Sequence, residues 1–474
     1  MEPVHVAPVD AGYLSMDASN TTGNVTLVLS LAGDLTLPAL RAHIQDRLPL
    51  LPELRRVLHE VAWGLDRPWW VDDAAFDLGQ HVAEHRLPNA LPGDPADPAD
   101  PSGTSGHIPP AVREAAARVL MQPLDRTRPL WRIDLVRAGR TGSRRAFVCV
   151  TIHHAMADGT QFLHVLRTLF DAHSHPAPQG DPWVATAAPA DAELLRRSAT
   201  ESIEWMWRNT FAAAGSIAGT VGQQAWQNLT TTSTQSAPVT PFNKTLSSDR
   251  AWGVASVPIG ASQAVRRRLG VTLNDLLHAM VAEALRDWML ARRALPATSL
   301  VVLVPKVAAG TSPDPGALNR IEMGVSTLPT HVTDPVARLR TIHAAMRQAK
   351  DTPLFTETVM DLAARMSTTS TSPLTRYAAD LAVQWRVMDY VPTGTNLVIS
   401  NVSMGTDRYE IADVEVTHVH PLSPLSNGQG VFVTTQGYRG HLDIGVTSCA
   451  QLMPDVQQVV DAMVACYERL CALG

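Results

Sequence analysis

The chain has 474 residues, of which 45% are hydrophobic and 18% charged, and its formal net charge is -6. This length predicts two domains of ordinary size with a connecting segment, and the composition excludes a disordered or fibrous protein. Because phosphate binding needs clustered positive charge and the sequence has no Lys/Arg-rich block, we expect no nucleic-acid partner.

The first part of the chain is predicted to alternate strands and helices. The stretch 146–152 is almost wholly apolar, which indicates a strand buried on both faces. Thr36 is a plausible N-cap for the helix that follows it. The density of Pro, Gly, Asp and Ser over 87–110 predicts a long exposed loop there. In chain order we predict a strand at 25–31, a helix at 37–48, the loop at 87–110, a helix at 111–121, strands at 132–136 and 146–152, and a helix at 159–170.

A change to Pro, Ala, Ser, Thr and Gln over 173–247 predicts a connection between domains, with a helical segment near 192–229. That segment carries Trp205, Trp207 and Trp226, for which we favour packing on the domains over a membrane-facing surface. The second part should hold strands at 251–259, 300–304, 396–402, 414–419, 430–435 and 442–447, and helices at 274–293, 335–350, 357–366 and 454–473.

Strands and helices mixed in both halves indicate an α/β fold class with mixed α+β sheets. We divide the chain into an N-terminal domain at 1–180, a connection at 181–247 and a C-terminal domain at 248–474.

The predicted environment of the protein is reducing. The amino terminus has neither a basic start nor an apolar run, and no stretch reaches the roughly 18 apolar residues of a membrane span. We therefore expect a cytoplasmic protein whose association with membranes or lipid droplets is at most peripheral. The four cysteines lack C-x-x-C spacing, so we predict that all of them are buried thiols in a reducing environment. They are Cys149, Cys449, Cys466 and Cys471.

One short sequence carries chemistry, His153-His154-Ala155-Met156-Ala157-Asp158-Gly159, at the junction of the buried strand with a helix. On the order of one H-x-x-x-D is expected by chance in such a chain, but the preceding His and the following Gly make this pattern far rarer. The alternatives are a pair of satisfied core histidines and a metal site. A third ligand with recognisable spacing is missing, so we predict no metal.

A neutral imidazole, with a reference pKa of about 6.5, can take a proton from an alcohol whose oxygen attacks a thioester. We predict this role for His154, while His153 is a second catalytic candidate that packs or orients the loop. Asp158 would brace the loop through an arginine, and Gly159 would allow a tight turn. No Gly-x-Ser-x-Gly elbow occurs and no cysteine lies near the histidines, which favours direct acyl transfer without a covalent intermediate.

The histidine sequence resembles the H-H-x-x-x-D-G hallmark of the bacterial wax ester synthase/acyl-CoA:diacylglycerol acyltransferase family. Other stretches are similar to that family in the same order, so the resemblance covers nearly the whole chain. They are Asp10-Ala11-Gly12-Tyr13-Leu14, Trp70-Val71-Asp72-Asp73, Phe76-Asp77-Leu78, Pro129-Leu130-Trp131, Thr240-Pro241-Phe242-Asn243, Asn274-Asp275, Asn319-Arg320, Leu328-Pro329-Thr330 and Ser400-Asn401-Val402.

This resemblance implies a two-domain chloramphenicol-acetyltransferase-like fold with a tunnel between the domains. It implies that acyl-CoA, as a substrate, donates a long-chain acyl group to diacylglycerol or a long-chain alcohol, with no cofactor. By the same resemblance His154 is the general base, Asp158 holds the loop, and Asn274 with Asp275 supports the site. Asn274 and Asn401 are candidates for the oxyanion donor.

Two alternative functions keep the same fold. One is an ester-forming transferase that takes its acyl group from a carrier protein. The other is a lipid-binding or lipid-droplet protein without catalysis, against which the intact histidine sequence argues.

Overall fold

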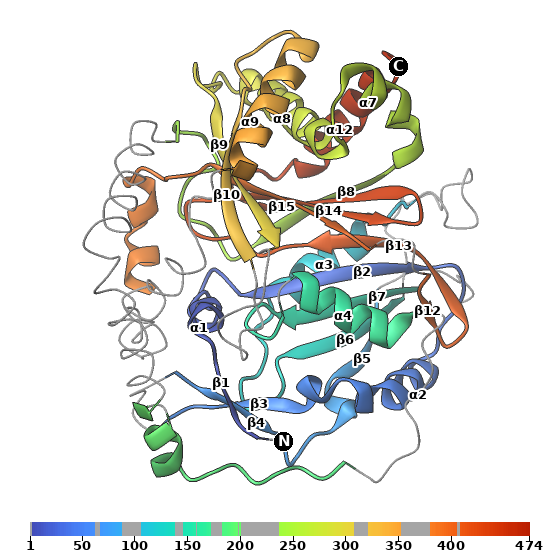
Figure 1. Ribbon diagram of the computed structural model, residues 1–474, viewed down its shortest axis with the longest axis vertical. Coiled ribbons are helices and arrows are strands. Elements are labelled where there is room, and N and C mark those ends of the chain that lie inside the picture. Colours follow the sequence, from blue (N-terminus) through green and yellow to red (C-terminus); the bar gives the residue numbers. More distant parts are fainter. Residues whose placement is uncertain are drawn as a thin grey trace.

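The computed structural model of the protein contains two six-stranded sheets, one in each half of the molecule (Figure 1). The predicted α/β class with mixed sheets is confirmed. No helix among the described residues is both long and apolar enough to cross a bilayer. The structure describes residues 2–61, 67–87, 106–137, 146–157, 159–171, 183–197, 199–200, 237–307, 321–351, 380–404 and 408–474.

The N-terminal sheet has the strand order β12-β13-β2-β7-β6-β5. Every side chain of β7 is buried, as its apolar sequence predicts. Its antiparallel pairing with β2 sets Asn24 opposite His153 at one end of the sheet. The strands are β2 (Asn24–Leu31), β5 (Val82–Arg86), β6 (Trp131–Arg137), β7 (Ala146–His153), β12 (Glu410–Ile411) and β13 (Val414–Leu422).

Two strands of this sheet come from the far end of the chain. β13 pairs antiparallel with β2, and β12 pairs with β13. The division into domains at 1–180 and 248–474 stays a prediction. The strand order shows that residues 410–422, from the predicted C-terminal domain, pair into the N-terminal sheet. The two halves are therefore joined by strand pairing as well as by side-chain packing.

Two helices cover one face of the N-terminal sheet, and a third helix packs on the opposite face. α2 (Leu37–Arg47) and α4 (Gly159–Phe170) share one apolar cluster with β2 and β7. The predicted N-cap is confirmed, because the Thr36 side chain accepts a hydrogen bond from the backbone of Ala39. On the opposite face α3 (Pro110–Met121) packs between this sheet and the C-terminal half.

The C-terminal sheet has the order β10-β9-β11-β14-β15-β8, and its helices lie on the side away from the N-terminal sheet (Figure 1). The apolar faces of these helices and strands form a second core. The strands are β8 (Arg250–Pro258), β9 (Leu300–Val307), β10 (Ile321–Leu328), β11 (Leu397–Ser403), β14 (Val431–Tyr438) and β15 (His441–Cys449), and the helices are α7 (Gln263–Leu269), α8 (Leu273–Ala291), α9 (Pro335–Asp351) and α12 (Val456–Cys471).

The two sheets approach each other closely where β13 meets β15. A Cβ atom on Gly445 would lie 1.8 Å from the carbonyl oxygen of Pro421, so only glycine fits there. Trp252 of β8 donates its indole N–H to the same carbonyl at 3.0 Å. Backbone contact and a hydrogen bond thus join the halves at one point.

Several predictions need correction or cannot be compared. Cys149, Cys449 and Cys466 are buried, but Cys471 is half-buried because it lies in the last turn of α12. Most of the predicted helix at 192–229, with its tryptophans, and all of that at 357–366 lie outside the described residues. A small sheet of β1 (Val4–His5), β3 (Arg56–His59) and β4 (Trp69–Asp72) was not predicted, nor were β5 and β10.

Candidate active site

The two histidines lie where β7 ends. His153 is the last residue of the strand, and α4 begins at Gly159. The backbone N–H of His153 donates to the carbonyl of Leu130 at 2.9 Å, and that of His154 donates to Gly23 at 2.8 Å. The backbone of the pair is therefore held from both sides, and Leu130 of Pro129-Leu130-Trp131 supplies one of the two acceptors.

The ring of His153 is locked in place. Its side chain is 1% exposed, its Nδ1 accepts the backbone N–H of Ala155 at 3.1 Å, and its Nε2 lies 3.3 Å from Oδ1 of Asp17. Because Nδ1 is an acceptor, the neutral ring carries its proton on Nε2, facing the carboxylate. Both nitrogens of His153 are thus engaged inside the protein.

Asp17 is the carboxylate that holds this ring. Its Oδ1 also accepts the backbone N–H of Gly23 at 2.9 Å, and its Oδ2 lies 3.1 Å from Nη2 of Arg126. Burial alone would raise the pKa of Asp17, but the hydrogen bond and electrostatic attraction of the His153 ring, the Gly23 N–H and Arg126 together hold that pKa well below its usual value. Asp17 is therefore ionised at neutral pH.

Glycine is required at position 23 because the chain passes against the His153 ring. A Cβ atom there would lie 2.6 Å from Nε2 of His153 and 3.0 Å from the carbonyl oxygen of Tyr13. The same residue donates to Asp17 and accepts from His154. Gly23 thus connects the backbone of His154 to Asp17, the carboxylate that holds the His153 ring.

His154 has a different environment. Its side chain is half-buried, and its ring stacks on the Tyr13 ring with centroids 3.9 Å apart and planes 9° from parallel. Tyr13 lies in α1 (Pro8–Leu14). Stacking fixes the plane of the imidazole while leaving its edge, which carries the nitrogens, to other contacts. An oriented imidazole beside a fully engaged one can act as a general base.

The remaining predicted site residues are distributed over both halves. Asp158 lies outside the described residues, and Gly159 opens α4. Asp275 caps α8 through Thr272 and accepts from His343 at 2.8 Å, and the carbonyl of Asn274 accepts from His278. Asn401 of β11 is exposed and accepts from Thr435 at 3.0 Å. The roles predicted for these residues in the reaction stay predictions.

Sequence reasoning missed Asp17, Gly23 and Arg126. Asp17 is 136 positions from His153, and no local pattern connects the two. Tyr13 belongs to the Asp10-Ala11-Gly12-Tyr13-Leu14 stretch, but its contact with His154 depends on how α1 packs. Only the resemblance drew attention to that stretch.

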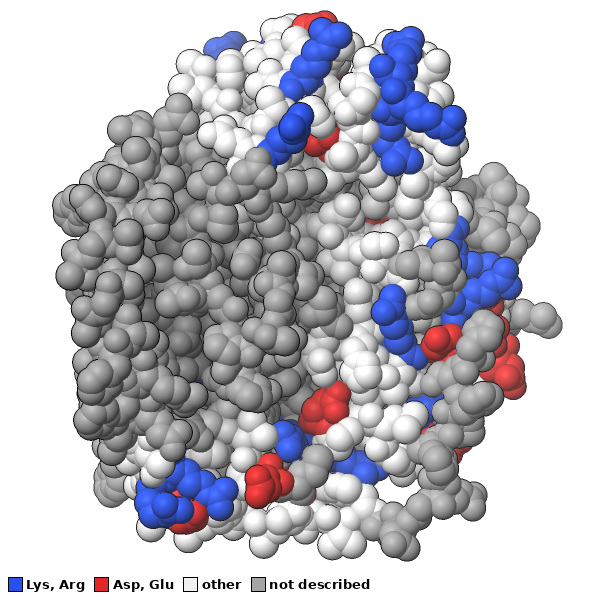
Figure 2. Space-filling view, in the orientation of Figure 1, with Lys and Arg blue, Asp and Glu red and all other residues white. Residues whose placement is uncertain are grey.

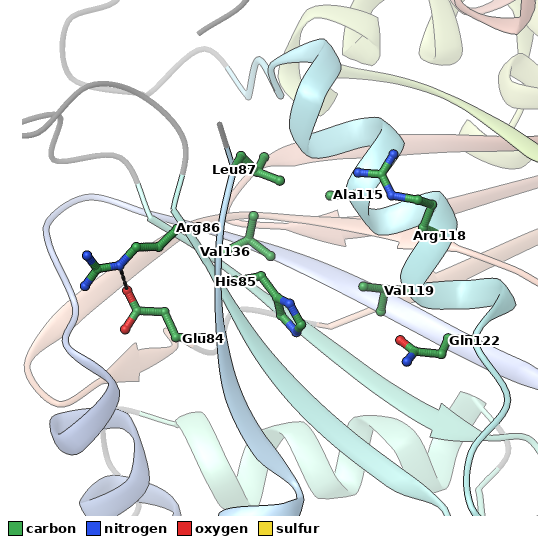
Figure 3. A pocket seen from close by; sticks show the side chains of 9 residues that line it. All are labelled: Glu84, His85, Arg86, Leu87, Ala115, Arg118, Val119, Gln122 and Val136. Atoms are coloured by element: carbon green, nitrogen blue, oxygen red, sulfur yellow. Dashed lines mark hydrogen bonds and ion pairs between the residues drawn. The ribbon is translucent and has the colours of Figure 1, made fainter. Parts of the chain in front are cut away.

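A cavity of about 650 Å³ lies on the α3 side of the N-terminal sheet (Figure 3). Its lining combines an ion pair, Arg86 with Glu84 at 3.0 Å, with apolar side chains such as Val119 and Val136. Neither histidine of the pair lines it. We therefore do not assign the reaction to this cavity.

Family models match both halves of the chain. Residues 6–277 match the wax ester synthase/diacylglycerol acyltransferase catalytic domain, and residues 318–470 match the C-terminal domain of the same family. A Mycobacterium tuberculosis protein assigned as a diacylglycerol O-acyltransferase is 27% identical over 480 residues, which cover 98% of this chain and 89% of that protein. The similarity thus runs from end to end.

Solved structures share the fold. A wax ester synthase/diacylglycerol acyltransferase from Marinobacter aquaeolei VT8 superposes with a TM-score of 0.64 at 19% identity, covering 98% of each chain. The starter condensation domain of rhizomide synthetase, solved with C8-CoA and Leu-SNAC, gives a TM-score of 0.53 at 13% identity, covering 99% of this chain and 93% of that one. These likenesses confirm the predicted two-domain acyltransferase fold.

Proposed function

Because the chain belongs to the wax ester synthase/diacylglycerol acyltransferase family and is an acyltransferase, we propose that it esterifies a lipid hydroxyl with a long-chain acyl group from acyl-CoA. The acceptor is diacylglycerol, a long-chain alcohol or both. His154 is the general base, and no cofactor takes part.

The observation that supports this assignment is the difference between the two histidines. His153 is buried, with Nδ1 occupied by Ala155 and Nε2 facing Asp17. To accept a proton from an alcohol it would have to break one of these contacts. His154 is half-buried, oriented by Tyr13, and placed one residue beyond the strand. We therefore assign proton transfer to His154 and positioning to His153.

In the proposed reaction the alcohol binds with its hydroxyl beside the His154 imidazole. The ring takes the hydroxyl proton while the oxygen forms a bond to the thioester carbonyl carbon, which gives a tetrahedral oxyanion. Its collapse breaks the carbon–sulfur bond, and the departing thiolate takes the proton from His154. The products are an ester and CoA with a free thiol, and the enzyme returns to its starting state.

The cysteine on the same strand does not favour a covalent route. Cys149 is fully buried, and burial raises the pKa of its thiol far above the usual value. A neutral buried thiol is a poor nucleophile. Direct transfer between the two substrates is therefore the simpler proposal.

Other site residues enter the proposal through the resemblance. Asp158 and Gly159 shape the loop after the histidines, Asn274 and Asp275 support the site from α8, and Asn274 or Asn401 stabilises the oxyanion. The capping box between Thr272 and Asp275 supports a rigid start for α8, which suits such a support role.

We also propose a cytoplasmic enzyme that meets its lipid acceptor at a membrane or lipid-droplet surface and has no nucleic-acid partner. On the face in Figure 2, Lys and Arg outnumber Asp and Glu at the top, over the C-terminal helices, and both signs of charge occur over the N-terminal half. The described part of that face has no continuous basic stripe of the kind that tracks a phosphate backbone.

The test is to incubate the purified protein with labelled palmitoyl-CoA and either diacylglycerol or hexadecanol, and to resolve the lipids. Labelled ester with at least one acceptor supports the proposal. Ester formed only when an acyl-carrier thioester replaces acyl-CoA would favour the carrier-dependent alternative. No ester under any condition would favour a lipid-binding protein without catalysis.

A further inference from the structure

One apolar segment of the protein buries none of its side chains. Residues 381–391 form a helical turn and a short 3-10 helix, and every residue is half-buried or exposed. Soluble proteins bury the apolar residues of such helical segments, so this surface requires an explanation. Its apolar members are Leu381, Ala382, Val383, Trp385, Val387, Met388, Tyr390 and Val391.

The exposure is greatest at two aromatic rings. Trp385 is 69% exposed, Tyr390 82% and Val391 47%. Among the exposed large hydrophobic residues of the described chain, Trp385 and Tyr390 are the only aromatic ones. We call Trp385, Tyr390 and Val391 the aromatic surface.

Polar contacts fasten this segment to the body of the protein. Asp389 accepts the backbone N–H of Thr245 at 2.8 Å and pairs with Arg386 at 2.8 Å, and Asp380 accepts the backbone N–H of Ser19 at 3.3 Å. The acidic residues of the segment thus bind the body of the protein, while Trp385, Tyr390 and Val391 stay exposed.

The aromatic surface lies beside the loop that holds the histidine pair. Ser19, which contacts Asp380, is two residues from Asp17. Asn20 of the same loop donates to the carbonyl of Leu246, next to the Thr245 contact. A lipid that enters the protein next to this surface would start close to the residues that position the base.

We propose that the aromatic surface inserts into an uncharged lipid surface and brings the active site to its lipid acceptor. This inference rests on the proposed function, because it takes the acceptor to be a membrane or droplet lipid. Indole and phenol rings prefer the boundary between water and hydrocarbon. Asp380, Arg386 and Asp389 give the segment no excess of positive charge, so it suits neutral or zwitterionic lipid and gains nothing from anionic lipid.

The test measures binding and chemistry separately. Cosedimentation without acyl-CoA uses phosphatidylcholine vesicles that contain diacylglycerol, with and without phosphatidylglycerol, at low salt and at about 0.5 M salt. We compare the wild type with Trp385→Ala/Tyr390→Ala, with Trp385→Phe/Tyr390→Phe, and with the matched control Leu290→Ala, whose side chain is 47% exposed on α8. Turnover with a water-soluble short-chain alcohol reports the chemistry.

The wild type should bind at both salt concentrations and with either lipid composition. The alanine pair should bind roughly tenfold more weakly, because interfacial binding scales with the apolar area inserted, while the phenylalanine pair and Leu290→Ala should retain most of the binding. Turnover of the soluble alcohol should be unchanged in all variants.

Three results would overturn the inference: equal binding by the alanine pair, binding that needs anionic lipid and disappears in salt, or loss of soluble-alcohol turnover together with vesicle binding. The last would show that the segment only supports the fold. Binding by the wild type without any ester formation would leave the aromatic surface in place and contradict the proposed function instead.

Discussion

Replacing Asp17 by alanine tests the network that positions the histidine pair. The substitution removes the acceptor of His153 Nε2 and of the Gly23 N–H, both of which face the inside of the protein. An unsatisfied buried donor costs about 1–3 kcal/mol. Because the Asp17 side chain is 20% exposed and water can reach part of the gap, we expect the free energy of unfolding to fall by about 2 kcal/mol.

The effect on turnover should be larger than the effect on substrate binding. If His153 tilts, the His154 backbone that follows it shifts, and a displacement of about 1 Å at a reacting group can lower a rate about a hundredfold. We therefore expect kcat to fall roughly a hundredfold with little change in KM. Asp17→Asn keeps an acceptor oxygen and should lose less of both.

The assays are steady-state ester formation and urea unfolding, with Asp34→Ala as the matched control. Asp34 is half exposed and pairs with Arg137 at 3.0 Å, so its removal should change neither quantity much. Folding lowers the pKa of Asp17 from its ordinary value of 3.8. The ionised carboxylate therefore stabilises the folded protein fully above pH 3.8, and this contribution is lost as the pH falls through the lowered pKa. The stability difference between wild type and Asp17→Asn should therefore be constant above pH 3.8 and shrink below it. Wild-type kcat in Asp17→Ala would refute the positioning role.

Three further predictions concern the ring stack and the joint between the sheets. Tyr13→Phe should keep kcat near the wild-type value because the stack on His154 remains, whereas Tyr13→Ala should lower kcat about tenfold; similar rates in both would deny the stack a role. Gly445→Ala should lower the free energy of unfolding by more than about 3 kcal/mol because its Cβ meets a β13 carbonyl, while Gly260→Ala, with open space around it, should be nearly neutral in the same urea titration. Burial lowers the pKa of His420 from 6.5 to about 4, so only the unfolded chain takes up its proton between these values; stability should fall by on the order of 3 kcal/mol as pH drops through this window, and His420→Phe should remove that part of the slope.

The sequence predicts most of the central strands and helices because their patterns are local. β7 is a continuous apolar run, and α2 has both helical spacing and a capping threonine. Two edge strands, β5 and β10, lack these signals, whereas the edge strand β8 was predicted. β10 lies at the end of its sheet and contains Gly324, and β5 has only two apolar residues in five, so neither pattern stands out.

The histidine pair was recognisable from seven adjacent residues, but the groups that position it were not. Asp17 reaches His153 across 136 positions of sequence, and Arg126 reaches Asp17 across 109. Gly23 is needed only because the His153 ring lies against it. The place of β13 in the N-terminal sheet could not be predicted for the same reason, because it depends on contacts between distant parts of the chain. Its alternating sequence identifies a strand but carries no information about which sheet receives it.

The central claim is that His154, and not His153, exchanges the proton with the alcohol. The most direct test is ester formation by His154→Ala, with circular dichroism and thermal unfolding to establish that the variant is folded. We predict a fall in kcat of roughly a thousandfold or more at neutral pH, with the fold unchanged, since a positioned base contributes about 10²–10⁴. Turnover within a few-fold of the wild type in the folded variant would contradict the account.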